Sequence, residues 1–222
     1  MIGRKLLAVF WALYALVYDK IWDSPLTTAI ADVSLRFAVP NANVVDLGCG
    51  TGLISGHLLR SGCNVTGVDF SRSMLRRAMS KKRLVSPVHS DAEDSNLASG
   101  CADLVLLCNV LHVHSDAARL VVEAARLAKP SSIIFICGPV GGLRNSTLVG
   151  VELSLGRGLG GVLIAHLLRS TISRLARLTG VRPDGARSLR SVLQVAEKHS
   201  LKVVHSEVLF GCQAITVLRT PE

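Results

Sequence analysis

Glycines and carboxylates at regular spacing are the residues of this sequence best suited to binding a ligand. An apolar run, Val44–Leu47, leads directly into a turn, and that turn contains Gly48, Gly50 and Gly52. Glycine tolerates positive φ angles and lets backbone N–H groups approach a ligand, while a helix that follows presents its positive N-terminal end. Asp69 ends the next apolar run, where a carboxylate can accept hydrogen bonds from both hydroxyls of a ribose. The pattern therefore predicts a site for a nucleoside cofactor.

The spacing of the glycines distinguishes between nucleoside cofactors. The nicotinamide fingerprint G-x-G-x-x-G/A, counted from Gly48, requires a small residue where the chain has Leu53. The frame that fits is Asp-x-Gly-x-Gly-x-Gly, beginning at Asp46. This frame resembles motif I of the class I S-adenosylmethionine-dependent methyltransferases, which implies S-adenosyl-L-methionine as the cofactor. Tyr18 starts a Tyr-Asp-x-x-Trp segment similar to one found in many small-molecule members, where the tyrosine often closes over the methionine end of the cofactor.

The resemblance to this family continues over roughly residues 40–140. Gly67–Ser71 followed by Met74 resembles the strand end that binds the ribose, and His89–Asp94 resembles the segment at the adenine edge. Asp103–His112 is similar to the family's fourth strand and the turn after it. The resemblance implies that the cofactor is bound by Tyr18, Asp46, Gly48, Gly50, Asp69, Phe70, Met74, Asp91, Ala92 and Asn109.

Short apolar runs rich in β-branched residues alternate with segments of helical length. The runs lie at about 43–47, 64–68, 84–89, 103–108, 131–137, 201–209 and 212–218. This alternation predicts a mainly parallel sheet with helices on both faces. Gly211 predicts a tight reversal and an antiparallel pair at one edge. The family resemblance implies a doubly wound, seven-stranded, Rossmann-like α/β fold with N-terminal helices and a helical cap after strand five.

The length of 222 residues suits one doubly wound sheet with a small cap. We therefore expect a single methyltransferase domain over residues 1–222. Its expected parts are an N-terminal helical lid at 1–40, a cofactor-binding core at 41–140, a substrate cap at 141–185, and a C-terminal helix with edge strands at 186–222.

The composition narrows the range of partners. Hydrophobic residues make up 49% of the chain and charged residues 18%, which predicts apolar surface facing a hydrophobic substrate, a partner or a membrane. The six cysteines form no C-x-x-C pair, which is typical of reduced thiols in a cytoplasmic protein and not of a zinc site.

The net charge of +9 raises the question of nucleic acid binding. Base-methylating relatives carry an N/D-P-P-Y/F tetrad after strand four, whereas this chain has Asn109-Val110-Leu111-His112, and no aromatic stacking platform is visible. The end of strand four also presents no carboxylate cluster for Mg²⁺. We therefore expect no specific nucleic acid partner and no metal.

The N-terminal residues 4–17 form an apolar segment that allows two interpretations. An uncharged run of about a dozen residues follows Arg4 and Lys5, which is too short for a bilayer because a spanning helix takes about 20 residues. The run forms either a lid or dimer helix over the active site, or an interfacial membrane helix with Trp11 and Tyr14 at the level of the headgroups. The first interpretation allows a homodimer, and the second allows peripheral membrane contact of a cytoplasmic protein.

The expected cap contains a helical run from Val162 to Leu178 that carries Arg169, Arg174 and Arg177 among apolar residues. This pattern indicates an amphipathic basic helix. Three interpretations stay open: a surface helix whose arginines extend into water, recognition of an anionic acceptor, and contact with an anionic membrane.

Methyl transfer from a sulfonium is an in-line displacement, so the protein must chiefly position the acceptor and exclude water. An oxygen or nitrogen acceptor that must lose a proton needs a base, and histidine titrates near neutral pH. The candidates are His112, His114 and His166, with His112 favoured because it closely follows Asn109. A carbon acceptor needs no base, but the aromatic content of 4% argues against the aromatic face that would steady a cation.

These observations predict a methyltransferase that acts on a hydrophobic small molecule such as a specialised metabolite, a lipid or a quinone. The alternative is a non-catalytic or membrane-associated S-adenosylmethionine-binding protein, or a member of the fold that promotes a cyclisation.

Overall fold

The protein is built around one twisted sheet, and its computed structural model describes residues 2–114, 116–141, 143–178 and 185–222. Side chains are described for residues 9–176 and 192–222 within these ranges. The side chains of Arg4, Lys5 and Arg177 therefore lie outside the described residues. So do residues 179–184, at the end of the expected cap.

The elements alternate along the chain as the apolar runs predict. The strands are β1 (Asn43–Leu47), β2 (Asn64–Asp69), β3 (Ser86–His89), β4 (Ala102–Cys108), β5 (Ala128–Pro139), β6 (Lys202–Leu209) and β7 (Gln213–Arg219). The helices are α1 (Ile2–Trp22), α2 (Pro25–Leu35), α3 (Leu53–Arg60), α4 (Arg72–Ser80), α5 (Ala117–Leu127), α6 (Asn145–Ser154), α7 (Leu159–Leu178) and α8 (Gly185–Lys198), with a short 3-10 turn, η1 (Leu111–Val113).

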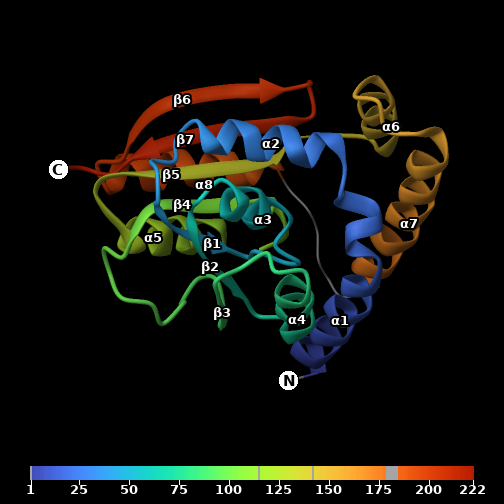
Figure 1. Cartoon of the computed structure of the whole chain (residues 1–222), viewed down its shortest axis with the longest axis horizontal. Coiled ribbons are helices and arrows are strands. Elements are labelled where there is room, and N and C mark those ends of the chain that lie inside the picture. Colours follow the sequence, from blue (N-terminus) through green and yellow to red (C-terminus); the bar gives the residue numbers. More distant parts are fainter. Residues whose placement is uncertain (1, 115, 142, 179–184) are drawn as a thin grey trace.

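The strand order in the sheet is β3-β2-β1-β4-β5-β7-β6 (Figure 1). Strands β1 to β5 pair in parallel, and β7 is antiparallel to both β5 and β6. Gly211, with a φ of +66°, lies in the reversal between β6 and β7, as its type predicts. The expected seven-stranded Rossmann-like fold, with N-terminal helices and helices inserted after β5, is confirmed.

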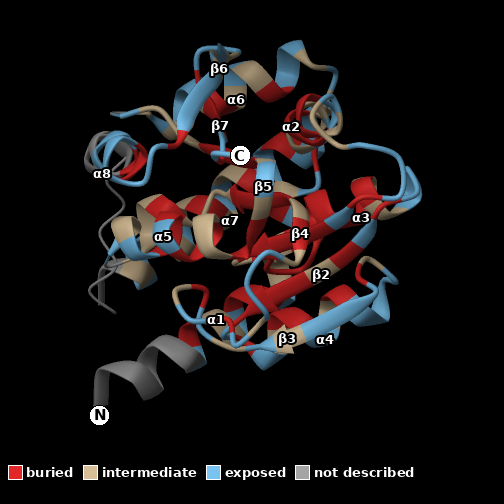
Figure 2. Cartoon of the chain, turned by 90° about the vertical axis from the view of Figure 1, so that its left-hand side faces the viewer, coloured by how far each residue is buried: buried red, intermediate tan, exposed pale blue. Residues whose placement is uncertain are grey.

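Each face of the sheet buries its own apolar cluster because side chains alternate along a strand. In β4, Leu104 and Leu106 pack into one cluster together with residues of α2 and α3. Val105 and Leu107 point to the other face, toward α5 and α8. Figure 2 shows the buried residues concentrated in the strands and on the helix sides that face them. The core is therefore the doubly covered sheet, and it leaves the carboxyl ends of the strands free for a site.

Two helices far apart in the sequence, α1 and α7, pack against each other beside that edge of the sheet (Figure 1). Phe10 and Tyr14 of α1 share a buried cluster with Ile172 of α7. Arg157, just before α7, donates hydrogen bonds to the carbonyls of Lys20 and Ile21 near the end of α1, so the start of α7 lies beside the end of α1 and the two helices run antiparallel. Within the described part of the chain, no helix has both the length and the apolar character needed to cross a membrane.

Candidate functional site

In the glycine turn between β1 and α3, the backbone adopts conformations that residues other than glycine would reach only with strain. Gly48, Gly50 and Gly52 adopt φ angles of +73°, +55° and +70°. The N–H of Gly48 donates to the carbonyl of Val68 at 2.8 Å, which ties the turn to β2. A Cβ on Gly48 would lie 2.5 Å from Cγ2 of Val110, well inside van der Waals contact. Close packing and backbone conformation therefore both require glycine at position 48.

Asp69 joins the glycine turn to the end of β2. Its carboxylate accepts hydrogen bonds from the backbone N–H of Gly50 at 2.9 Å and of Ser71 at 2.8 Å, one on each oxygen. The side chain is buried, and this burial raises its pKa to about 6 even though both hydrogen bonds favour the ionised form. Each carboxylate oxygen keeps a second lone pair, so both can still accept from a ligand hydroxyl.

Asp46 is a second buried carboxylate. It lies in β1 just before the glycine turn, and it lines a cavity. It accepts a hydrogen bond from the hydroxyl of Ser55 in α3. Burial and the negative charge of Asp69 together raise the pKa of Asp46 to about 6, although the hydrogen bond from Ser55 favours the ionised form. The site therefore places two carboxylates with raised pKa values beside the turn, which favours a positively charged ligand.

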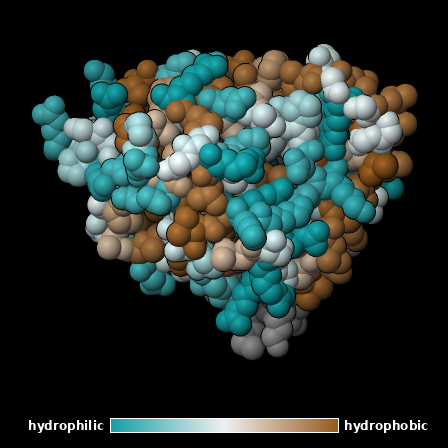
Figure 3. Space-filling model, viewed as in Figure 1, coloured by the Kyte–Doolittle hydropathy of each residue, from teal (hydrophilic) through white to brown (hydrophobic). Residues whose placement is uncertain are grey.

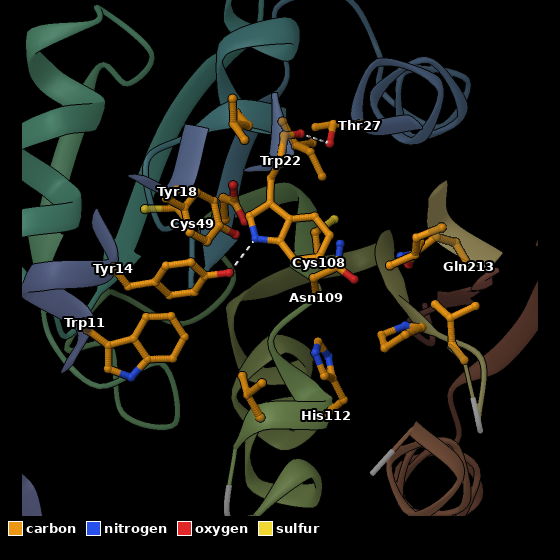
Figure 4. Close-up of a pocket in the computed structure, with 18 residues that line it drawn as sticks. Trp11, Tyr14, Tyr18, Trp22, Thr27, Cys49, Cys108, Asn109, His112 and Gln213 are labelled. Atoms are coloured by element: carbon orange, nitrogen blue, oxygen red, sulfur yellow. Dashed lines mark hydrogen bonds between the residues drawn. The ribbon is translucent and has the colours of Figure 1, made fainter. Parts of the chain in front are cut away.

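A cavity of about 150 Å³ opens between α1, the strand ends and α6 (Figure 4). Its aromatic wall consists of Trp11, Tyr14, Tyr18 and Trp22, which are all the tryptophans and tyrosines of the chain. The indole Nε1–H of Trp22 donates to the hydroxyl of Tyr14 at 2.6 Å, which fixes the two rings relative to each other. The remaining lining residues are Thr27, Asp46, Gly48, Cys49, Leu53, Ile54, Cys108, Asn109, His112, Val113, Pro139, Leu143, Leu148 and Gln213.

This cavity corrects two inferences drawn from the aromatic residues. Their low number argued against a cation-stabilising aromatic face, yet the fold gathers the tryptophans and tyrosines in one place. The interfacial interpretation placed Trp11 and Tyr14 outward at headgroup level, but both side chains line the cavity, and Tyr14 is buried. Composition alone could not reveal this because the cavity joins α1 to several strand ends, and the end of β4 among them lies more than 80 residues away in the sequence.

The structure separates the three histidines. His112 lines the cavity from η1, its Nδ1 has no hydrogen-bond partner among the described residues, and its burial lowers its pKa to about 4. His114 is not among the lining residues, since its ring faces the carboxylates of Asp91 and Glu93 at 3.5 and 4.0 Å. His166 on α7 is also outside the lining. We therefore carry forward His112 alone as a candidate base.

The other residues expected to bind the cofactor lie at or just after the ends of β2, β3 and β4. Asn109 lines the cavity with a φ of +55°, and its N–H donates to the carbonyl of Cys137. Asp91 and Phe70 are exposed, and Ala92 is buried. The structure does not support Met74 as a cofactor contact, because this side chain is fully buried against α1.

An ion-pair cluster that sequence reasoning missed fastens α1 to the glycine turn. Asp19 accepts hydrogen bonds from the Thr51 hydroxyl, from Lys81, and from Arg83 at 3.0 Å. Arg83 also donates to the carbonyl of Thr51 at 3.1 Å. Burial alone would raise the pKa of Asp19, but these hydrogen bonds hold it below its ordinary value. The cluster positions Tyr18, whose ring would meet a Cβ on Gly50 at 3.8 Å.

We expect Asp19→Asn to lower the free energy of unfolding at pH 7 by about 1.5 to 3 kcal/mol, the usual range for hydrogen bonds to a charged group. Asp23→Asn is the matched control because Asp23 also pairs with Arg83 but is 57% exposed, so its loss should cost less than about 1 kcal/mol. Urea denaturation of both variants tests this. A depressed carboxyl pKa stabilises the fold above its unfolded pKa, so the difference between wild type and Asp19→Asn should shrink as the pH falls. Equal losses in the two variants would contradict the cluster.

The basic helix pattern of α7 also has a different meaning in the structure. Arg169 is buried, pairs with Glu152 of α6 at 2.9 Å, and lies over the ring of Trp22 at 5.5 Å. Glu152 also pairs with Arg157 at 2.8 Å. Arg169 is therefore not a solvated surface arginine, although its Nη1 has no hydrogen-bond partner among the described residues, whereas Arg174 is exposed.

Comparison with known proteins agrees with this geometry. A protein-family model described as a methyltransferase domain matches residues 45–136, which contain the glycine turn, Asp69 and Asn109. Demethylmenaquinone methyltransferase of Clavibacter sepedonicus is 32% identical over 122 residues, 54% of this chain and 47% of that protein. Phosphatidylethanolamine N-methyltransferase of Cereibacter sphaeroides is 31% identical over 132 residues, 57% of this chain and 63% of that protein. The chain thus spans less than two thirds of either relative.

The solved structures support the fold. A SAM-dependent methyltransferase from Aquifex aeolicus superposes with a TM-score of 0.61 at 16% identity, and the match covers 91% of this chain and 92% of that one. At this identity the likeness concerns the arrangement of the sheet and helices alone.

Proposed function

Because the chain belongs to the class I S-adenosylmethionine-dependent methyltransferases, we propose that it transfers the methyl group of this cofactor to a hydrophobic small molecule. The observation that carries the proposal is the aromatic cavity directly beside the glycine turn. Such a wall suits an apolar acceptor held close to the methionine end of the cofactor. The names of the two relatives, which mention demethylmenaquinone and phosphatidylethanolamine, support the same class of acceptor.

The residues at the strand ends fit the cofactor. In this proposal Asp69 accepts hydrogen bonds from the ribose hydroxyls, with Phe70, Asp91 and Ala92 near the base. Gly48, Gly50, Asp46 and Asn109 surround the methionine portion, and Tyr18 closes over it. Support comes from Gly48, where a Cβ would not fit, and from the raised pKa values of the two carboxylates. Burial favours the protonated form of both carboxyl groups, and a bound cationic ligand would stabilise their ionised form instead.

S-adenosylmethionine supplies an activated methyl group on sulfur. This chain's residues therefore need only bind the cofactor, orient the acceptor and exclude water. We assign the lid role to residues 1–40, whose helix α1 contributes the aromatic wall, and the cap role to residues 141–185. From the cap, Leu143 and Leu148 close the apolar side of the cavity. Gln213 of β7 adds a buried amide that can fix the orientation of an acceptor.

His112 is the residue we propose to accept a proton from the acceptor. Burial lowers its pKa to about 4, so the imidazole is neutral at pH 7 and one of its ring nitrogens carries a lone pair that can accept a proton. We expect His112→Gln to lower kcat about 10²-fold without changing cofactor affinity. His114→Gln, outside the cavity, serves as the control and should keep wild-type kcat. Unchanged turnover in His112→Gln would mean that no general base is needed and that positioning of the reactants is the mechanism, as expected for a carbon acceptor or for an amine that is already neutral at the working pH.

The proposal is tested by supplying S-adenosylmethionine with acceptors of graded polarity and measuring S-adenosylhomocysteine. We expect the product to form with apolar quinols, phenols or lipid amines and not with their polar counterparts. The competing function is a non-catalytic cofactor-binding protein or a cyclisation catalyst. Tight cofactor binding with no S-adenosylhomocysteine from any acceptor would favour that alternative.

A further inference from the structure

The helix pair α1–α7 has an outer apolar surface that the fold leaves uncovered. On α1, the exposed side chains Val9, Leu13 and Leu16 follow helical spacing. On α7, the exposed apolar side chains are Leu159, Leu163, Ile164, Leu167 and Leu175. Leu13 is 58% and Leu167 66% exposed, values typical of polar surface positions. We call these eight residues the α1–α7 face.

The two stripes belong to one surface because their helices pack side by side and antiparallel. Figure 3 shows apolar side chains gathered along the right-hand edge of the molecule, where Figure 1 places α7 and α1. Scattered apolar residues are normal on a protein surface, whereas a contiguous patch marks a contact with another apolar phase.

The charge around this face indicates what covers it. The exposed charged side chains described on α1, on α7 and on the neighbouring α4 are all basic: Lys20, Arg72, Arg76 and Arg174. The acidic residue described on these helices, Asp19, is buried in its ion pairs. Asp23, just after the end of α1, is exposed but pairs with Arg83. Apolar side chains bordered mainly by positive charge suit a lipid surface, which is apolar inside and negatively charged at its headgroups.

We propose that the α1–α7 face docks on an anionic lipid bilayer, with its leucines in the acyl boundary and the basic side chains at the phosphates. The inner side of α1 carries Trp11, Tyr14, Tyr18 and Trp22 of the cavity wall. Docking therefore places the bilayer one helix away from the acceptor cavity. Docking would thus hold a lipid-soluble acceptor close to the cavity; this consequence rests on the proposed function, whereas the docking does not.

The test is co-sedimentation of the full chain with vesicles of phosphatidylcholine containing phosphatidylglycerol, compared with vesicles of phosphatidylcholine alone. We expect binding to the anionic vesicles that weakens with added salt. Leu13→Gln combined with Leu167→Gln should lower the partition coefficient at least about tenfold, because both side chains leave the apolar phase. Arg174→Gln should lower it on anionic vesicles only.

A matched control combines Val122→Gln on α5 with Leu193→Gln on α8, which are 40% and 48% exposed on helices away from the α1–α7 face. This variant should bind vesicles like the wild type. Circular dichroism and cofactor affinity should be unchanged in every variant, since none of these side chains lines the cavity.

Absence of wild-type binding to anionic vesicles, or equal binding by the Leu13/Leu167 variant, would overturn the proposal. A dimer detected by light scattering and abolished by the same two substitutions, without vesicle binding, would assign the face to a second copy of the chain instead. None of these readouts involves methyl transfer, so a failure of docking is distinguishable from a failure of the proposed activity.

Discussion

Gly48→Ala is expected to abolish measurable S-adenosylmethionine binding and to lower the free energy of unfolding by about 2 to 6 kcal/mol. The methyl group would meet Val110 at 2.5 Å, and its residue would keep a φ of +73°. Strain at such a φ and overpacking in a close-packed site each cost about 1 to 3 kcal/mol. Relief requires the turn to shift, which moves its N–H groups away from the ligand. Calorimetric titration and urea denaturation measure the two effects.

Gly62→Ala separates backbone strain from the loss of the site. Gly62 has a φ of +90° with open space around its Cβ position, and it follows the C-terminal end of α3, whereas the glycine turn precedes that helix. The Gly62→Ala variant should have a lower free energy of unfolding because of backbone strain alone, and it should bind the cofactor with wild-type affinity. Wild-type cofactor affinity in a folded Gly48→Ala variant would refute the assigned site.

Asp69→Ala is expected to weaken cofactor binding by about 1.5 to 3 kcal/mol, the range for a hydrogen bond to a charged group. The variant also removes the two hydrogen bonds that hold Gly50 and Ser71, so part of the loss comes from a looser turn. Ser55→Ala is a useful comparison because it removes a partner of Asp46 and leaves the carboxylates in place. Unchanged affinity in folded Asp69→Ala would contradict the ribose assignment.

The pH dependence of the same complex gives a second readout of Asp69. Its pKa of about 6 lies above the unfolded value, so ionising this group costs stability, and the stability present at low pH is lost as the pH rises through 6. A cationic cofactor favours the ionised carboxylate, so affinity should fall as the pH drops below about 6. Asp69→Ala should reduce this dependence, and Asp46→Asn should reduce it as well.

The features that are local in sequence could be predicted. The strands were visible because a buried parallel strand is a short continuous apolar run, and β4 is one such run with alternate residues in both core clusters. The glycine turn was recognisable because positive φ angles at Gly48, Gly50 and Gly52 leave few alternatives to glycine. Asp69 follows from strand order, since the end of β2 lies beside the end of β1.

The features made by long-range packing could not be predicted. The helical pattern of α7 gives no reason to treat Arg169 differently from Arg174 and Arg177. Arg169 is buried because it contacts Glu152 and Trp22, which belong to two other helices. His112 and His114 are two residues apart, yet η1 turns the first toward the cavity and the second toward Asp91. The wall formed by Trp11 and its neighbours depends on how α1 lies across the strand ends, and no local pattern encodes that.

The central claim is most directly tested by calorimetric titration of the purified chain with S-adenosyl-L-methionine, followed by S-adenosylhomocysteine as a competitor. We predict saturable one-to-one binding that the competitor displaces, and that Gly48→Ala abolishes while Gly62→Ala preserves it. A folded wild-type chain that binds neither molecule, or one that binds equally well with Gly48→Ala, would contradict the assignment of the crevice beside β1, β2 and β4 as the cofactor site.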